Sequence, residues 1–306
     1  MDNLKPPYWV INLASIILCI VVGIFTFRDW IRPFPLPKDG SASRDNRVKR
    51  LSSPLKWILL ALVCSLIRAC VIIALLAGVP VAFLEITQFY NFFGIAAEVL
   101  AFITALRVTR RFQSPSSTSE EEESSYVPTE KVEAEKKLNT ADIFVMTLLA
   151  TLGFTYWTTD LGASLRLNYG KRKFRNAYII FEAVRGLLTA YNVFLVITAI
   201  YISTRLLSKR RNKATSYSAS ATPTDLNARV TFTLKTIPTI MFVSIIIMVS
   251  GVMSLFIWYR SREWTYTQAY EALTVLNLLA KCIGEVLLLE FSRGALRRMT
   301  LAATSS

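Results

Sequence analysis

The sequence predicts an all-α membrane protein, a polytopic bundle of seven transmembrane helices. Of its 306 residues, 53% are hydrophobic and only 18% are charged, whereas soluble proteins average about 45–50% apolar and roughly 25% charged residues. The charges are also segregated, because long runs almost without them alternate with short, densely basic stretches. Seven of the apolar runs reach the roughly 20 residues that a helix needs to cross a bilayer.

The first run could be mistaken for a cleavable signal peptide. No positively charged segment leads into it, and its basic residues, Arg28 and Arg32, follow it instead. That order is the reverse of a signal sequence, so we expect an uncleaved span. The predicted spans are Tyr8–Phe27, Lys56–Gly78, Thr87–Arg107, Ala141–Leu161, Ala177–Thr204, Thr236–Trp258 and Thr267–Phe291.

The basic residues between the spans predict the orientation in the membrane. With seven spans, 24 Lys and Arg residues fall on one side and eight on the other. Cytoplasmic loops carry the excess of positive charge. The N-terminus is therefore expected outside and the C-terminus in the cytosol. The cluster Lys171-Arg172-Lys173 lies on the minority side, and a re-entrant fourth span would invert the topology after it.

The connecting segments show no second domain, so residues 1–306 are expected to form a single seven-helix transmembrane domain. Residues 28–55 predict a basic cytosolic linker with Pro33, Pro35, Pro37 and Gly40. Residues 109–140 contain the tract SPSSTSEEEESS, and residues 205–235 are basic and then rich in Ser, Thr and Ala. Both segments contain too few apolar residues to form a packed core, which predicts disordered cytosolic loops. Residues 292–306 are the expected cytosolic tail.

Composition also limits the function. A net charge of +14 would suggest nucleic acid in a soluble domain, but here the basic residues lie between spans and favour contact with anionic lipid. The chain has no His, and its four Cys lie inside apolar runs. No His or Cys metal or haem site is therefore expected, and no cofactor is predicted. The expected partners are membrane lipids and a small lipophilic molecule. The expected location is an integral one, in the endoplasmic reticulum and other endomembranes or in the plasma membrane.

Charged residues inside the spans are the first candidate site, because a charge at the bilayer centre costs about 2.5–3.5 kcal/mol on insertion scales. Arg68 lies midway through span two and Glu98 midway through span three. Since these spans are antiparallel neighbours, the two side chains are expected to pair. Lys281 and Glu285 lie four residues apart in span seven, which predicts a second pair within that helix. The alternative to a structural role is ligand binding or proton transfer.

A polar stripe in span five predicts a pocket. Glu182, Arg185 and Asn192 fall on one face of an otherwise apolar helix. The first two can also satisfy each other as an i, i+3 pair. Asn277 adds a polar group from span seven. Tyr156 and Trp157, near the outer end of span four, are expected to line the same pocket, which makes six candidate lining residues in all.

Seven spans with the N-terminus outside resemble G-protein-coupled receptors in topology. The residues Leu106-Arg107-Val108 lack the acid that precedes the arginine in that family, and span seven ends in LLLEFSRG without its Asn-Pro-x-x-Tyr motif. A receptor-like sensor without those motifs is one alternative function. A transporter or a structural membrane protein is a further alternative.

In size, span number and reliance on membrane carboxylates, the chain resembles small integral-membrane terpene cyclases of fungal secondary metabolism. It is equally similar in plan to uncharacterised fungal seven-span proteins. The resemblance implies an acid-initiated cyclase acting on a prenylated lipid, in which a neutral carboxyl donates a proton and aromatic rings stabilise the cation. The acid should have no cation that holds it ionised. Glu271 is the first candidate and Asp160 the second.

Overall fold

The computed structural model describes residues 5–31, 41–77, 83–111, 140–169, 174–216, 225–260 and 267–305, and this part of the chain is helical throughout apart from a turn at Ala77. No strand occurs among these residues. The helices are α1 (Lys5–Ile31), α2 (Ser41–Leu76), α3 (Phe83–Arg111), α5 (Thr140–Tyr169), α6 (Phe174–Ser216), α7 (Asp225–Arg260), α8 (Thr267–Leu279), the π-helical turn η4 (Ala280–Gly284) and α9 (Glu285–Ser305).

Seven helices in the described part of the chain are long and apolar enough to cross a membrane, with α8, η4 and α9 forming one of them. The predicted all-α class is therefore confirmed for the described residues, and the number of helices that could cross a membrane equals the seven predicted spans. Each predicted span coincides with one of these helices. The N-outside orientation remains a prediction, because it depends on how the basic loops face a membrane.

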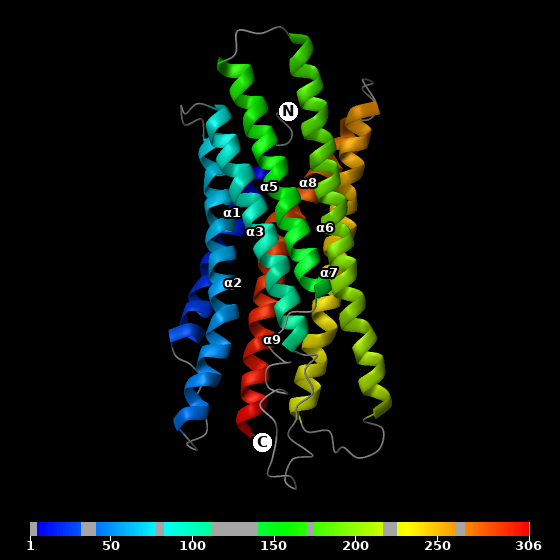
Figure 1. Ribbon diagram of the computed structural model, residues 1–306. Helices are drawn as coiled ribbons and strands as arrows, with labels where there is room; N and C mark the ends of the chain where they lie inside the picture. Colours follow the sequence, from blue (N-terminus) through cyan, green and yellow to red (C-terminus); the bar gives the residue numbers. More distant parts are fainter. Residues whose placement is uncertain are drawn as a thin grey trace.

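The helices form an elongated antiparallel bundle, with the C-terminus at one end and the N-terminus toward the other (Figure 1). Helix α3 lies at its centre and packs against α2, α5, α6 and α9. In the most apolar stretch of α3, 61% of residues are buried, compared with 22% in α5. Most side chains of α3 are therefore inside the protein, whereas most side chains of α5 are on its outer surface.

Outward faces carry large apolar side chains that the protein leaves uncovered. Phe144, Phe154, Phe242 and Phe256 are each about 60% exposed or more. A soluble protein would bury such residues, but hydrocarbon is a suitable solvent for them. Several threonine hydroxyls in the spans donate hydrogen bonds to the backbone of their own helix. Thr26 donates to the Val22 carbonyl, and Thr104, Thr109 and Thr198 likewise donate to the carbonyl four residues earlier. This satisfies them where no water is present.

Helix extends into segments that the sequence predicted as loops. Helix α2 begins at Ser41, α6 continues to Ser216 and α7 begins at Asp225. The end of α6 reads SKRRNKATS, and Lys and Arg are good helix formers whose charge is favourable at a helix C-terminus. The tail is likewise helical through Ser305. The remainder of the predicted linker and loops, residues 32–40, 112–139 and 217–224, and the Lys171-Arg172-Lys173 cluster lie outside the described residues.

Candidate functional site

Four charged side chains from three spans meet in the middle of the bundle. Arg68 of α2 lies 3.1 Å from Glu285 of α9 and 4.0 Å from Glu98 of α3. Lys281 of η4 lies 3.2 Å from Glu98. Two cations and two carboxylates balance each other, so the network is neutral if all four are ionised. We refer to Arg68, Glu98, Lys281 and Glu285 as the charge network.

Small and hydroxyl-bearing side chains place the network between the helices. A Cβ on Gly94 would lie 3.2 Å from Cδ of Arg68, so the absence of a side chain lets the guanidinium pass over α3. Ser65, one turn before the arginine, donates a hydrogen bond to Oε1 of Glu285 at 2.6 Å. The hydroxyl of the buried Tyr191 donates to Oε2 of Glu98 at 2.9 Å. Each carboxylate therefore has a hydroxyl donor as well as a cation.

The π-helical turn η4 exposes backbone acceptors at the same point. The backbone N–H of Glu285 bonds to the carbonyl of Ala280, five residues earlier instead of four. Arg68 donates through Nη2 to the carbonyl of Lys281, and Ser15 of α1 donates to the carbonyl of Cys282 at 3.2 Å. Such turns are rare in proteins, and those that occur are often at functional sites, because they alter the helix locally. Helices α1 and α2 thus both bond to one irregular turn.

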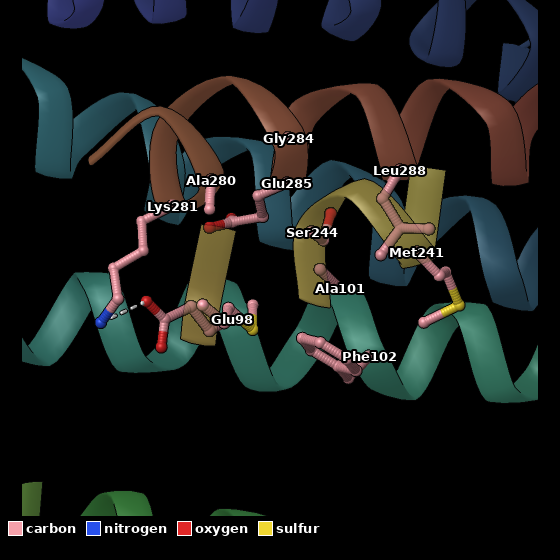
Figure 2. A pocket seen from close by; sticks show the side chains of 11 residues that line it. Glu98, Ala101, Phe102, Met241, Ser244, Ala280, Lys281, Gly284, Glu285 and Leu288 are labelled. Atoms are coloured by element: carbon pink, nitrogen blue, oxygen red, sulfur yellow. Dashed lines mark ion pairs between the residues drawn. The ribbon is translucent and has the colours of Figure 1, made fainter. Parts of the chain in front are cut away.

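A small cavity adjoins the network (Figure 2). Its volume, counted as the space open to the centre of a water molecule, is about 10 Å³. That is room for roughly one water. Glu98, Lys281 and Glu285 line one end, and Figure 2 shows Lys281 extending from η4 toward the Glu98 carboxylate. The other end is apolar and flexible, with Phe102, Met241, Met248 and Leu288 among its lining residues.

A second polar cluster joins the N-terminal part of α3 to the C-terminal half of α5. Asp160 accepts hydrogen bonds through Oδ2 from Gln88 and from Asn91, each at 2.9 Å. Gln88 also donates to Ser164 at 3.0 Å. No cation pairs with Asp160 among the described residues, and Oδ1 accepts no hydrogen bond from them. We refer to Gln88, Asn91, Asp160 and Ser164 as the amide–acid cluster.

Aromatic side chains connect the two clusters. The indole of Trp157 donates to the carbonyl of Gln88 at 3.3 Å and lies 4.9 Å from the ring of Phe92. Tyr156 is buried and stacks on Tyr191, with ring centroids 6.5 Å apart and planes 14° apart. The sequence predicted that Tyr156 and Trp157 line one pocket. In the structure they contact different residues, Trp157 bonding Gln88 and Tyr156 leading through Tyr191 to the charge network.

No described contact joins the remaining predicted pocket residues to these clusters. Glu182 and Arg185 form the i, i+3 pair that the sequence allowed, at 3.1 Å, with side chains that are 27% and 34% exposed. Asn192 donates to the Leu188 carbonyl of its own helix. Asn277 packs against Gly251 of α7, where an added Cβ would lie 2.5 Å from its Oδ1. The span-five stripe therefore does not form one polar pocket with Asn277.

Glu271, the first predicted acid, is half-buried on α8. Among the described residues it has no hydrogen-bond or ion-pair partner, and nothing there joins it to Asp160 or Trp157. The two predicted acids are therefore not brought together by any described contact.

The partners within the charge network differ from those predicted. Lys281 was expected to pair with Glu285, but its ammonium contacts Glu98 instead. Arg68 was expected to pair with Glu98, which lies at the 4.0 Å limit, while Glu285 lies closer. The reason is competition from the guanidinium, since it holds Glu285 from the α2 side and leaves Glu98 for the lysine. The two pairs that the sequence predicted separately are therefore joined in one network.

Sequence reasoning missed Tyr191, Ser65 and Gln88. Ser65 could have been found, because it precedes Arg68 by three residues and shares its helix face. Tyr191 lies beside Asn192, where an aromatic residue in a span ordinarily contributes apolar packing.

In the part of the chain that the structure describes, no group of three or more His, Cys, Asp or Glu residues could hold a metal ion.

Comparison with known proteins identifies no relative: no family model, no curated protein and no solved structure matches the chain.

Proposed function

We propose that this protein is a ligand-responsive membrane protein, a seven-span sensor in which the contact between Lys281 and Glu98 is a conformational switch. The observation that carries the proposal is the presence of two competing cations around one buried carboxylate. Glu98 contacts Lys281 at 3.2 Å, while Arg68 lies at 4.0 Å. A small helix movement can exchange one partner for the other without leaving the carboxylate bare.

Burial identifies which contact breaks. The side chain of Lys281 is 19% exposed, whereas those of Arg68, Glu98 and Glu285 are at most 5% exposed. Removing a buried charge from its partners is costly, but a half-buried lysine on a flexible stem can move away. The lysine is also on the π-helical turn, where the helix repeat can change locally. Such a two-state element is what couples a ligand to a global change.

The size of the central cavity favours a sensor over a cyclase at this position. Binding pockets for drug-sized molecules have volumes of about 300–1,000 Å³, far above the roughly 10 Å³ beside the charge network. A prenyl chain could not fold there without a large rearrangement. A switch needs only a little free space, and the flexible Met241 and Met248 side chains supply a boundary that can repack.

The switch can be tested without knowing the ligand. Spin labels at Lys56→Cys on α2 and Lys235→Cys on α7 would report the spacing of two exposed positions in nanodiscs, with the exposed Cys70 replaced by Ser. Helix α9 packs against both α2 and α7, so its movement should change that spacing. We expect one main distance in the parent and a second population in Lys281→Met.

Lys281→Arg is the matched control, because it keeps the charge and should keep the parent distance distribution. Thermal unfolding would establish that each variant is folded. If Lys281→Met is folded and its distance distribution equals that of the parent, the contact is a structural pair and the sensor proposal fails.

The second candidate function is the acid-initiated cyclase, and the geometry of Asp160 favours it. Both amides donate to Oδ2, so no described residue donates to Oδ1, and the indole of Trp157 bonds the carbonyl of the same Gln88. In such a reaction the acid protonates an epoxide oxygen, the C–O bond opens, an alkene attacks the cation and a proton is lost. The product is an isomer of the substrate. A prenylated epoxide should therefore be converted without change of mass, and Asp160→Asn should abolish this while Glu271→Gln should not.

A further inference from the structure

We infer that Asp160 and Gln88 bind the ammonium group of a small amine, which is the signal that reaches the charge network. The inference deepens the sensor proposal and rests on it only for the coupling step. Binding itself depends on the amide–acid cluster alone.

Asp160 differs from the other carboxylates with partners in the described bundle by having no cation. Asp142 pairs with Arg205, Asp29 and Glu290 pair with Arg293, Glu182 pairs with Arg185, and the network acids pair with Arg68 and Lys281. Among the described residues Asp160 has only amide donors, both on Oδ2. Its half-buried carboxylate, with no cation among the described residues, would attract the positive charge of a ligand.

An orphan oxygen lies beside it. Gln88 is 7% exposed, and its Oε1 is buried without a hydrogen-bond partner. The amide nitrogen on the same carbon donates to Asp160 and Ser164, which fixes its orientation at the cluster. An unpaired buried acceptor of this kind ordinarily costs about 1–3 kcal/mol. A donor from a ligand would satisfy it.

The chemistry of these acceptors selects an ammonium. A primary ammonium has three N–H donors and a positive charge, which suit two free oxygens, one of them on a carboxylate. A neutral alcohol brings one donor and no charge. The rings of Trp157 and Phe92 lie next to the cluster, 4.9 Å apart, and aromatic faces stabilise a cation within about 6 Å. Their apolar surface also suits a hydrocarbon or aromatic body attached to the amine.

Two physical connections lead from this cluster to the switch. Gln88 and Asn91 are on α3, the helix that carries Glu98. Tyr156, one turn before Asp160 on α5, stacks on Tyr191, whose hydroxyl donates to Glu98. An ammonium that draws α3 and α5 together would therefore displace both the α3 backbone and the tyrosine that holds the Glu98 carboxylate.

Binding can be measured with simple probes on the full-length protein in phosphatidylcholine nanodiscs. The probes are methylammonium, n-hexylammonium and 2-phenylethylammonium, with 2-phenylethanol as the neutral control, and the readout is the dissociation constant from calorimetry. We expect at least one amine to bind and the alcohol to bind much more weakly. Asp160→Asn, which keeps the side-chain shape, should raise the dissociation constant roughly 10- to 100-fold.

Glu271→Gln is the matched control, because it removes the other half-buried carboxyl without a cation in the described chain, and it should bind like the parent. Gln88→Met is a second variant for the case in which Asp160→Asn does not fold, and it should also weaken binding. Replacing part of the phosphatidylcholine by phosphatidylethanolamine separates the sources of the ammonium. Strong competition would identify a lipid headgroup, and no competition a free amine.

The inference is overturned if no amine binds, if the amine and the alcohol bind equally, or if Asp160→Asn and Gln88→Met both bind like the parent. Adding the amine to the spin-labelled protein tests the coupling separately. Binding without a change in the distance distribution leaves the ammonium site intact and removes the sensor proposal. Since an ammonium needs an ionised Asp160, confirmed binding also argues against that residue as the acid of a cyclase.

Discussion

Replacing Arg68 by Met should reveal which carboxylate the arginine neutralises. The side chain of Arg68 is 2% exposed, so when it is removed no water solvates the carboxylates that it neutralised. The change leaves Glu98 and Glu285 with one lysine between them, and breaking a buried pair in this way costs about 3–5 kcal/mol. Arg68→Met is therefore expected to lower the free energy of unfolding by that amount.

The distances predict which second substitution restores stability. Because Coulomb attraction varies inversely with distance, the contact of Arg68 with Glu285 at 3.1 Å is about 1.3 times as strong as that with Glu98 at 4.0 Å. Arg68→Met with Glu285→Met leaves a neutral pair, Lys281 and Glu98, already in contact at 3.2 Å. Arg68→Met with Glu98→Met leaves Lys281 and Glu285, which have no contact in the structure and must rearrange.

Double-mutant cycles measured by denaturant unfolding in detergent micelles would test this difference. Coupling energies between contacting residues are about 0.5–3 kcal/mol. We expect the coupling of Arg68 with Glu285 to exceed that with Glu98. A larger coupling with Glu98, or additive losses in both cycles, would refute the arrangement described for the network. Arg107→Met is a useful control, since Arg107 stacks over Trp57 away from the network.

Three smaller perturbations have distinct expected costs, each measurable by thermal unfolding in the same micelles. Tyr191→Phe removes the buried hydroxyl that bonds the α3 carboxylate and should cost about 1–3 kcal/mol; an unchanged midpoint would mean that this bond contributes nothing. Gly251→Ala places a Cβ 2.5 Å from Oδ1 of Asn277 and should cost about 1–3 kcal/mol, whereas with Asn277→Ala the same change should be tolerated better. Glu182→Gln breaks a partly exposed pair with Arg185 and should cost less than about 1 kcal/mol of unfolding free energy. A larger loss would mean that the pair is more buried than the structure shows.

The sequence alone determined the architecture and the identity of the buried charges. A helix that crosses hydrocarbon must be apolar along its length, so the seven runs from Tyr8 to Phe291 were visible without any tertiary information. The same rule made Arg68, Glu98, Lys281 and Glu285 conspicuous. It also explains why the helix ends were less certain, since the basic stretch after Thr204 is equally compatible with helix or coil once it leaves the membrane.

Only the tertiary structure decided the partners. Periodicity places residues on a face of one helix, but it does not say which neighbouring helix that face meets or at what depth. Lys281 and Glu285 are compatible with an i, i+4 pair, yet Arg68 approaches Glu285 from α2 and Lys281 turns to Glu98. The π-helical turn, the Tyr191 donor and the orphan oxygen of Gln88 have the same origin. The turn bonds to Ser15 and Arg68, Tyr191 bonds Glu98, and the Gln88 amide is held by Asp160. These partners are distant in the chain and are set by the packing of the whole bundle.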